Sequence, residues 1–237
     1  MKKFGTEKYI SHLSIDCVIF GYKEKELKVL IAKSKFGEGI WNLPGGYIIK
    51  NEGIEKAANR ILKERTGLEN IYLEQFRVFG HENRIFDSKF RELLLTHISQ
   101  KYNKADAEWM ASRFICIGFY ALVEISKVNP QNGELDEYLE WRSIMDIPEM
   151  MHDHNQILDY ALEALRQNFD QKFIGFNLLP ETFTMKELQE LYEAVYDRPF
   201  ATNNFQKKIL DLNVLERLQK KYTGAANKAP YLYRFKK

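Results

Sequence analysis

The most specific string in the sequence is residues 41–46 (WNLPGG), which is followed at fixed intervals by Glu52, Arg60, Glu64, Gly67 and Leu68. Residues 53–65 carry apolar side chains at i, i+3, i+4, i+7 and i+8, which predicts an amphipathic helix that stops at Gly67. Carboxylates on such a helix are the oxygen ligands that Mg²⁺ and Mn²⁺ prefer. The last two turns hold Glu64 as their one carboxylate, so we expect an Arg60–Glu64 surface ion pair instead of a metal site.

A second candidate chemistry lies in the C-terminal part, where positive charge is concentrated. The whole chain has a net charge of +2, whereas residues 198–237 hold 10 basic and only 2 acidic side chains. Clustered positive charge supplies the sequence-independent part of nucleic-acid affinity. This segment therefore predicts a polyanion-binding module, and charge alone leaves a solvated basic surface as the alternative.

Composition limits the classes of protein that can carry these residues. The 237 residues are 45% hydrophobic and 29% charged, which indicates one large or two small folded domains and excludes a disordered chain. No window approaches the ~18 to 20 apolar residues of a membrane span, and the first residues lack a signal-peptide core, so we expect no membrane partner and a cytoplasmic protein. Cys17 and Cys116 lie in apolar runs and predict buried thiols, with neither a metal nor a cofactor.

The N-terminal elements must position the WNLPGG string. β-Branched and aromatic runs predict strands at residues 14–20, 28–33, 71–79 and 114–125, with the amphipathic helix between the second and third. Residues 86–112 predict a helix or a long insertion, to which we assign no role. A helix is expected over residues 155–168, and residues 173–180 predict an extended connector. We place the first domain at residues 1–150.

The C-terminal segment has a different pattern. Thr184 and Glu187 form a capping box, and Phe183 and Leu188 are spaced for a hydrophobic staple, so a helix starts here. A second helix over residues 201–212 should bury Phe205, Ile209 and Leu212. Two strands, at residues 214–222 and 231–235, complete a helix, helix, hairpin order. This order is typical of a winged helix, in a domain of residues 151–237.

The spacing around WNLPGG resembles the Nudix box. Gly46, Glu52, Arg60, Leu62, Glu64, Gly67 and Leu68 match its pattern, and the resemblance extends over residues ~10–150. It implies an α/β/α sandwich and, in Nudix hydrolases, helix glutamates that hold magnesium or manganese. Ile61 and Arg65 replace two of these three glutamates here, so we expect no catalytic residues. Rescue by carboxylates outside the box is the open alternative, with the candidates Glu124, Glu137 and Glu140.

A metal-depleted Nudix domain followed by a basic winged helix resembles the Nudix-related, NrtR/AraR-like transcriptional regulators. The fold class implied is α+β: a Nudix-type α/β/α sandwich followed by a winged-helix DNA-binding domain. The resemblance implies an effector-sensing regulator of double-stranded operator DNA, and a winged helix of this kind most often acts as a homodimer. The alternative function is a metal-dependent Nudix hydrolase of ADP-ribose or ADP-sugars.

The family resemblance implies a small-molecule effector, either ADP-ribose or a sugar such as L-arabinose. A neutral pentose is our first expectation, because two phosphates need a metal or an arginine cluster and only Arg60 and Arg65 stand around the box. ADP-ribose is the second. Residues beside the box are the candidate effector ligands: Asp16, Lys33, Asn42, Gly46 and His81.

The second C-terminal helix is the expected recognition helix. Its outward side chains should reach base edges in the major groove, where amides pair with adenine: Asn203, Asn204, Gln206 and Lys207. Phosphate contacts are expected from Arg198, Lys208, Lys220, Lys221, Lys228 and Arg234. Asn227 and Lys228 at the wing tip should reach toward the minor groove.

Overall fold

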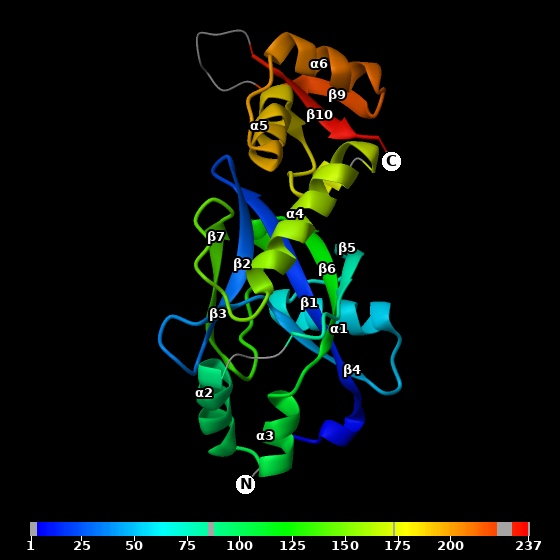
Figure 1. Cartoon of the computed structure of the whole chain (residues 1–237). Helices are drawn as coiled ribbons and strands as arrows, with labels where there is room; N and C mark the ends of the chain where they lie inside the picture. Colours follow the sequence, from blue (N-terminus) through cyan, green and yellow to red (C-terminus); the bar gives the residue numbers. More distant parts are fainter. Residues whose placement is uncertain (1–3, 85–87, 173, 222–228, 237) are drawn as a thin grey trace.

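The computed structural model describes residues 4–84, 88–172, 174–221 and 229–236. A mixed sheet forms the N-terminal region, and a smaller helical region with its own sheet lies at the far end of one long helix, α4 (His154–Gln171) (Figure 1). This division follows the two patterns in the sequence. Among the described residues, none of the helices has the length and apolar character to span a bilayer.

The N-terminal sheet has a parallel central pair of strands. The strands are β1 (Tyr9–Lys23), β2 (Glu26–Ser34), β3 (Trp41–Asn42), β4 (Gly45–Ile49), β5 (Tyr72–Phe79), β6 (Ile115–Val123) and β7 (Asp136–Ser143). Their order is β3-β2-β1-β6-β5, with β4 beside β1 and β7 beside β2. Parallel β1 and β6 align Leu13 with Ile115. Both are covered on two faces, which explains their uninterrupted apolar runs.

One helix covers each face of this sheet. Helix α1 (Ile54–Thr66) buries the predicted stripe of Ala57, Ala58, Ile61 and Leu62 against one face, and it ends at Gly67, whose φ of 73° is left-handed. Helix α4 packs on the other face through Ile157, Leu158 and Ala161. The α/β/α sandwich expected from the sequence is confirmed.

The segment to which the sequence assigned no role forms two short helices, α2 (Ser88–Ser99) and α3 (Lys104–Met110). They share a small separate core with Phe36 of the β2–β3 loop. The expected extended connector at residues 173–180 is wrong: Ile174–Asn177 form a 3-10 helix. The turn brings Ile174, Leu178 and Leu179 into the core beside α4, which an extended chain could not do.

The C-terminal region is a winged helix. It consists of β8 (Phe183–Thr184), α5 (Met185–Tyr196), α6 (Thr202–Asp211), β9 (Leu215–Lys220) and β10 (Tyr231–Phe235). The strand order is β8-β10-β9, and the Thr184–Glu187 capping box is present. Phe205 and Ile209 are buried as expected, but Leu212 is 39% exposed. The reason is that α6 ends at Asp211, so Leu212 no longer lies on its buried stripe.

An apolar cluster joins the two regions. It runs from Val18 and Phe20 of β1 through Leu165 and Phe169 of α4 to the winged helix, where it includes Leu191 and Phe205. Because α4 packs against both regions, the boundary between residues 1–150 and 151–237 stays a proposal. Because this core is continuous, a displacement of α4 would change the packing of both the Nudix-type sheet and the winged helix.

Candidate functional site

The helix of the box has an apolar side chain where a metal-binding glutamate would stand. Ile61 is 1% exposed and lies in the core between α1 and the sheet. A Cβ added at Gly46 would lie 3.0 Å from the Ile61 side chain, so the glycine allows the isoleucine to pack on the loop backbone. This position is filled with hydrocarbon and offers no ligand to a cation.

Arg65 occupies the second replaced position as a structural clamp. Its Nη1 donates to Asp136 Oδ2 at 2.9 Å, and its Nη2 donates to the Gly45 carbonyl at 3.0 Å. Asp136 also accepts the Gly133 N–H at 2.7 Å. The clamp joins α1, the box loop and β7, and it fixes a positive charge where a hydrolase of this fold would place a metal-binding carboxylate.

The retained polar residues of the box brace its loop. Glu52 accepts hydrogen bonds from the Ile49 N–H at 2.8 Å and from Arg60 Nε at 3.1 Å. Arg60 also donates to the Tyr47 carbonyl at 2.9 Å and pairs with Glu64 at 3.3 Å. The hydrogen bond from Arg60 holds the pKa of Glu52 below its ordinary value. Glu52 is therefore an ionised brace, saturated by its protein partners.

The three glutamates outside the box that could replace the missing metal ligands are each paired with a basic side chain. Glu124 lies 2.6 Å from Lys127, Glu137 lies 3.2 Å from Lys33, and Glu140 pairs with Arg142. Within the described residues, no three His, Cys, Asp or Glu side chains gather in a group that could hold a metal ion.

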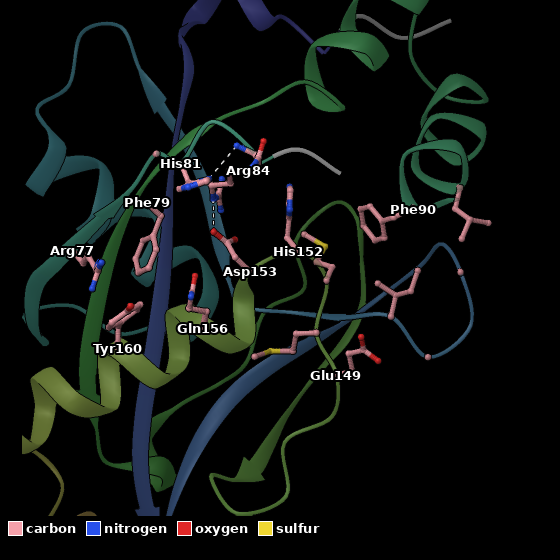
Figure 2. Close-up of a pocket in the computed structure, with 18 of the residues that line it drawn as sticks. Arg77, Phe79, His81, Arg84, Phe90, Glu149, His152, Asp153, Gln156 and Tyr160 are labelled. Atoms are coloured by element: carbon pink, nitrogen blue, oxygen red, sulfur yellow. Dashed lines mark hydrogen bonds and ion pairs between the residues drawn. The ribbon is translucent and has the colours of Figure 1, made fainter. Parts of the chain in front are cut away.

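A pocket of about 1270 Å³ opens on the α4 side of the sheet (Figure 2). It lies between the end of β5, the start of α4, the β2–β3 loop and α2. Its lining consists of residues 37–40, 77–81 and 149–153 together with Asn83, Arg84, Phe90, Leu93, Gln156 and Tyr160. The charged and aromatic side chains of Figure 2 come from elements far apart in the sequence.

One wall of the pocket combines a guanidinium with two aromatic rings. The guanidinium of Arg77 lies 3.8 Å from the centre of the Tyr160 ring, and the Phe79 ring lies 6.0 Å from that of Tyr160. Arg77 and Phe79 come from β5, whereas Tyr160 comes from α4. The two rings are tilted by 49°, and guanidinium and aromatic groups of this kind are surfaces on which a nucleobase can stack.

The floor of the pocket is a buried ionic network around Arg84, whose side chain is 6% exposed. Its Nε donates to Asp153 Oδ2 at 2.8 Å, its Nη1 donates to the Phe114 carbonyl at 3.1 Å, and its Nη2 lies 3.5 Å from Asp16. Asp16 also accepts a 2.8 Å hydrogen bond from the Cys116 thiol. The carboxylates of Asp16 and Asp153 thus both pair with the Arg84 guanidinium at the bottom of the pocket.

Two histidines adjoin this floor in their neutral form. Burial lowers the pKa of His152 to about 4, and the nearby Arg84 adds to this effect. Burial also lowers the pKa of His154, whose Nδ1 accepts the Leu43 N–H at 2.9 Å. This bond ties the first residue of α4 to the LPGG loop.

The structure separates the five sequence-assigned effector residues. His81 lines the pocket with a side chain that is 70% exposed, and Asp16 lies beneath it against Arg84. Lys33 pairs with Glu137, Asn42 accepts from Ser34 Oγ at 2.9 Å, and Gly46 packs on Ile61, all away from the lining. Arg77, Arg84, Asp153 and Tyr160 were missed, because periodicity marks strands and helices but not which of their ends meet.

Helix α6 presents a polar face to solvent. Asn203, Asn204, Gln206 and Lys207 are exposed, opposite buried Phe205 and Ile209. This is the arrangement that a recognition helix needs. Contact with DNA by these residues stays a prediction, and Asn227 and Lys228 lie outside the described residues.

The basic residues of the winged helix differ in their partners. Lys208 pairs with Asp170 at 2.7 Å, Lys221 with Glu187 at 3.1 Å, and Arg234 with Glu216 at 2.8 Å. Arg198 and Lys220 lie over the rings of Phe200 and Tyr231. The cations of the first group are thus partly neutralised by a carboxylate, whereas those of the second contact an aromatic ring.

Two family models match the chain. The NUDIX domain matches residues 10–164, and the NrtR DNA-binding winged helix domain matches residues 175–235. The chain is 25% identical to the ADPR responsive transcriptional repressor NtrR of Acinetobacter baylyi, over 94% of this chain and 81% of that protein. It is also 37% identical to the ADP-ribose pyrophosphatase of Methanocaldococcus jannaschii, over 29% of this chain and 41% of that enzyme.

Solved structures show the same architecture. Shewanella oneidensis NrtR superimposes with a TM-score of 0.70 at 24% identity, over 95% of this chain and 94% of that one. A MutT/nudix family protein from Enterococcus faecalis gives a TM-score of 0.68 at 18% identity, over 96% and 87% of the two chains. The chain therefore belongs to the Nudix family and is an NrtR-like regulator, in which a Nudix domain precedes a winged-helix DNA-binding domain of the NrtR type.

Proposed function

We propose that this protein is a transcriptional repressor that binds operator DNA through its winged helix and responds to ADP-ribose bound in its Nudix domain. One observation carries the proposal: the Nudix box has Ile61 and Arg65 in its metal positions, in a chain whose α6 presents a polar face to solvent. The name of the Acinetobacter baylyi relative, an ADPR responsive transcriptional repressor, supports the same function.

The pocket on the α4 face is the proposed effector site. Its volume of about 1270 Å³ exceeds the ~300–1,000 Å³ usual for drug-sized ligands, and a single pentose would leave most of it empty. The preference for a pentose rested on a lack of arginines, yet the pocket brings Arg77 and Arg84 together with His81. ADP-ribose fits this chemistry better, because its base can stack on the Tyr160 wall and its pyrophosphate needs cations.

We propose that the domain binds ADP-ribose without hydrolysing it. Metal-dependent hydrolysis of a pyrophosphate needs carboxylates that hold the cation and polarise the phosphate. Ile61 is buried hydrocarbon and Arg65 is paired with Asp136. The competing function, a hydrolase of ADP-ribose or ADP-sugars, has the similarity to an archaeal pyrophosphatase in its favour. An assay for AMP release decides between them.

DNA recognition is assigned to α6 and the hairpin. The amides of Asn203, Asn204 and Gln206, with Lys207 beside them, are proposed to read base edges, and the basic residues of the hairpin are proposed to hold phosphates. Two such domains on a twofold axis would read two half-sites, so we propose a homodimer. Sedimentation of the full-length chain measures this state directly.

The test begins with DNA selection, since it needs no known operator. Duplexes are selected from a random library with the full-length protein, and their affinity is measured by fluorescence anisotropy with ADP-ribose, L-arabinose or neither. We expect a consensus site, an affinity that changes with ADP-ribose alone, and no AMP release with Mg²⁺ or Mn²⁺. Turnover at ~1 per second, ordinary for an enzyme, would contradict the repressor assignment.

Two substitutions sharpen the DNA assignment. Asn203→Ala should cost ~1 to 3 kcal/mol at the selected site and relax sequence preference. Lys220→Ala should weaken binding to all duplexes alike and lower the salt slope by about one unit. Unchanged DNA affinity in both variants would move the interface away from α6 and the hairpin.

A further inference from the structure

Helix α4 touches both functional regions. Gln156 and Tyr160 in its first half line the pocket, whereas the ring of Phe169 near its end lies 5.0 Å from that of Tyr192 in the winged helix. Its 18 residues span about 27 Å at 1.5 Å per residue. Figure 1 shows this helix running from the Nudix sheet to the DNA-binding domain. A displacement at its start would therefore be carried along a rigid element.

The start of α4 is held by an ion pair that a ligand can replace. Asp153 directly precedes the first helical residue and accepts the 2.8 Å hydrogen bond from Arg84 Nε. Asp153 and Arg84 both line the pocket, whereas Asp16, the second carboxylate near Arg84, does not. A phosphate that binds Arg84 from the pocket would have to displace Asp153, whereas Asp16, which lies outside the lining, could keep the guanidinium in place.

The next residue is fixed and can act as a pivot. His154 is buried and accepts the Leu43 N–H at 2.9 Å, which links α4 to the LPGG loop. Neither His154 nor Leu43 lines the pocket. Release of Asp153 therefore changes the first turn of α4 beside a contact that stays in place.

The other end of α4 holds the helices of the winged helix. Asp170 Oδ2 lies 2.7 Å from Lys208 Nζ on α6. Arg166 Nε donates to the Val195 carbonyl at 2.7 Å, and the Tyr196 hydroxyl donates to the Arg166 carbonyl at 3.1 Å. The last turns of α4 thus set the position of α5 and of the recognition helix. A DNA phosphate bound to Lys208 would lie close to the Asp170 carboxylate and be repelled by it, so the two anions compete for this ammonium.

We propose that α4 transmits effector binding to DNA through two carboxylates, Asp153 at the pocket and Asp170 at the recognition helix. The inference rests on the proposed function and names the residues that couple effector binding to DNA binding. An anionic effector that takes Arg84 from Asp153 shifts the first turn of α4, and the shift reaches α6 through the Asp170–Lys208 pair. An effector moves such an equilibrium only through contacts that differ between the two states, and the Arg84–Asp153 pair is that contact.

The test measures coupling in the full-length chain. ADP-ribose affinity is measured by calorimetry, and affinity for the selected duplex by anisotropy with and without saturating ADP-ribose. In the wild type we expect a change in DNA affinity of about fivefold or more. Asp153→Asn removes the carboxylate that competes for Arg84, so it should bind ADP-ribose more tightly than the wild type. Asp153→Asn and Asp170→Asn should both reduce the coupling factor by at least about threefold. The control Glu69→Gln, which removes an exposed ion pair with Lys63 next to α1, should keep the wild-type factor.

The outcomes separate the two proposals. If the wild-type protein does not bind ADP-ribose, and ADP-ribose does not change its affinity for DNA, both the proposed function and this inference are overturned. Wild-type coupling in both variants overturns the transmission role alone. Should Asp153→Asn fail to fold, a cycle of Asp170→Asn with Lys208→Gln at the partly exposed pair still decides: strictly additive effects on the coupling factor refute the role, and non-additive effects support it.

Discussion

The two faces of the Nudix sheet use polar residues in opposite ways. On the α1 face, Arg60 and Arg65 are saturated by Glu52 and Asp136, and the space between helix and sheet is filled by side chains such as Ile61. On the α4 face, Arg77 stacks on Tyr160 and Arg84 pairs with Asp153 and Asp16, yet both arginines line an open pocket. The box spacing thus preserves the geometry of a helix and its loop, while the space for a ligand lies on the other face.

Electrostatics explains how the α1 face can be closed without metal-binding carboxylates. Three carboxylates on one helix face repel each other unless a cation lies between them. An isoleucine at position 61 removes one charge and adds buried apolar surface, and Arg65 turns the next position into an ion pair with Asp136. Both replacements stabilise the domain without a metal. The α4 face carries no such requirement, and its pocket is open.

The largest expected effect comes from restoring one glutamate on the closed face. Ile61→Glu places a carboxylate in a fully packed core, where an unpaired charge costs about 3 to 5 kcal/mol. We expect a loss of this size in the free energy of unfolding, measured by urea denaturation, with no gain of hydrolysis. The control Ile61→Val should cost about 1 kcal/mol. A stable Ile61→Glu protein with metal-dependent turnover would show that the site is open after all.

The second prediction concerns the wall of the open pocket. Tyr160→Ala removes the ring that stacks on Arg77, and stacking of a base on an aromatic ring is worth about 1 to 3 kcal/mol. ADP-ribose should therefore bind about 5- to 150-fold more weakly in calorimetry. The control Tyr138→Ala removes an exposed tyrosine of β7 outside the lining and should keep the affinity. Equal losses in both variants would place the base elsewhere.

The third prediction is a pH dependence that comes from the α4 face between pH 7.5 and pH 5. Burial lowers the pKa of His152 from 6.5 in the unfolded chain to about 4 in the folded protein. Between these two values, the His152 imidazole is protonated mostly in the unfolded chain. The stability from the neutral imidazole is complete above pH 6.5 and is lost as the pH falls toward about 4. The buried thiol of Cys17 on the α1 face, with its pKa raised to about 12, adds nothing in this range.

Urea unfolding at pH 7.5 and pH 5 measures this dependence. We expect the free energy of unfolding to fall by about 1 kcal/mol or more over this interval in the wild type. His152→Gln should fall by less, because it removes one of the buried imidazoles. The control His81→Gln changes a side chain that is exposed in the folded protein and should follow the wild type. A His152→Gln curve that matches the wild type would contradict the assignment.

Local patterns predicted most helices of this fold. The stripe of α1, its stop at Gly67 and the Thr184–Glu187 capping box are encoded within a few residues each, and the structure contains all three. Strand β7 (DEYLEWRS) was missed, because it pairs with β2 alone and its charged residues hide the alternation. The 3-10 turn at Ile174–Asn177 was missed because its apolar residues fill a tertiary gap and follow no local period.

The site was less predictable than the fold for a geometric reason. Arg84 and Asp153 are 69 positions apart, and what joins them is the crossing of α4 over the end of β5. No spacing in the sequence encodes such a meeting. The strand and loop positions beside the box suggested His81, Lys33 and Asn42 alike, but only His81 of these three lines the pocket.

The smallest predicted effect falls on Glu64, the remaining glutamate in the second half of the box. Its side chain is 58% exposed and pairs with Arg60 at 3.3 Å, a contact worth a few tenths of a kcal/mol. In a metal-dependent site this carboxylate would be indispensable, whereas a ligand on the α4 face never meets it. Glu64→Gln should therefore leave ADP-ribose affinity within about twofold of the wild type, both in millimolar Mg²⁺ and in EDTA. Calorimetry of both proteins under both conditions provides the comparison. A loss of affinity in Glu64→Gln that matches the loss caused by EDTA would return the ligand to the α1 face and end the contrast between the two faces.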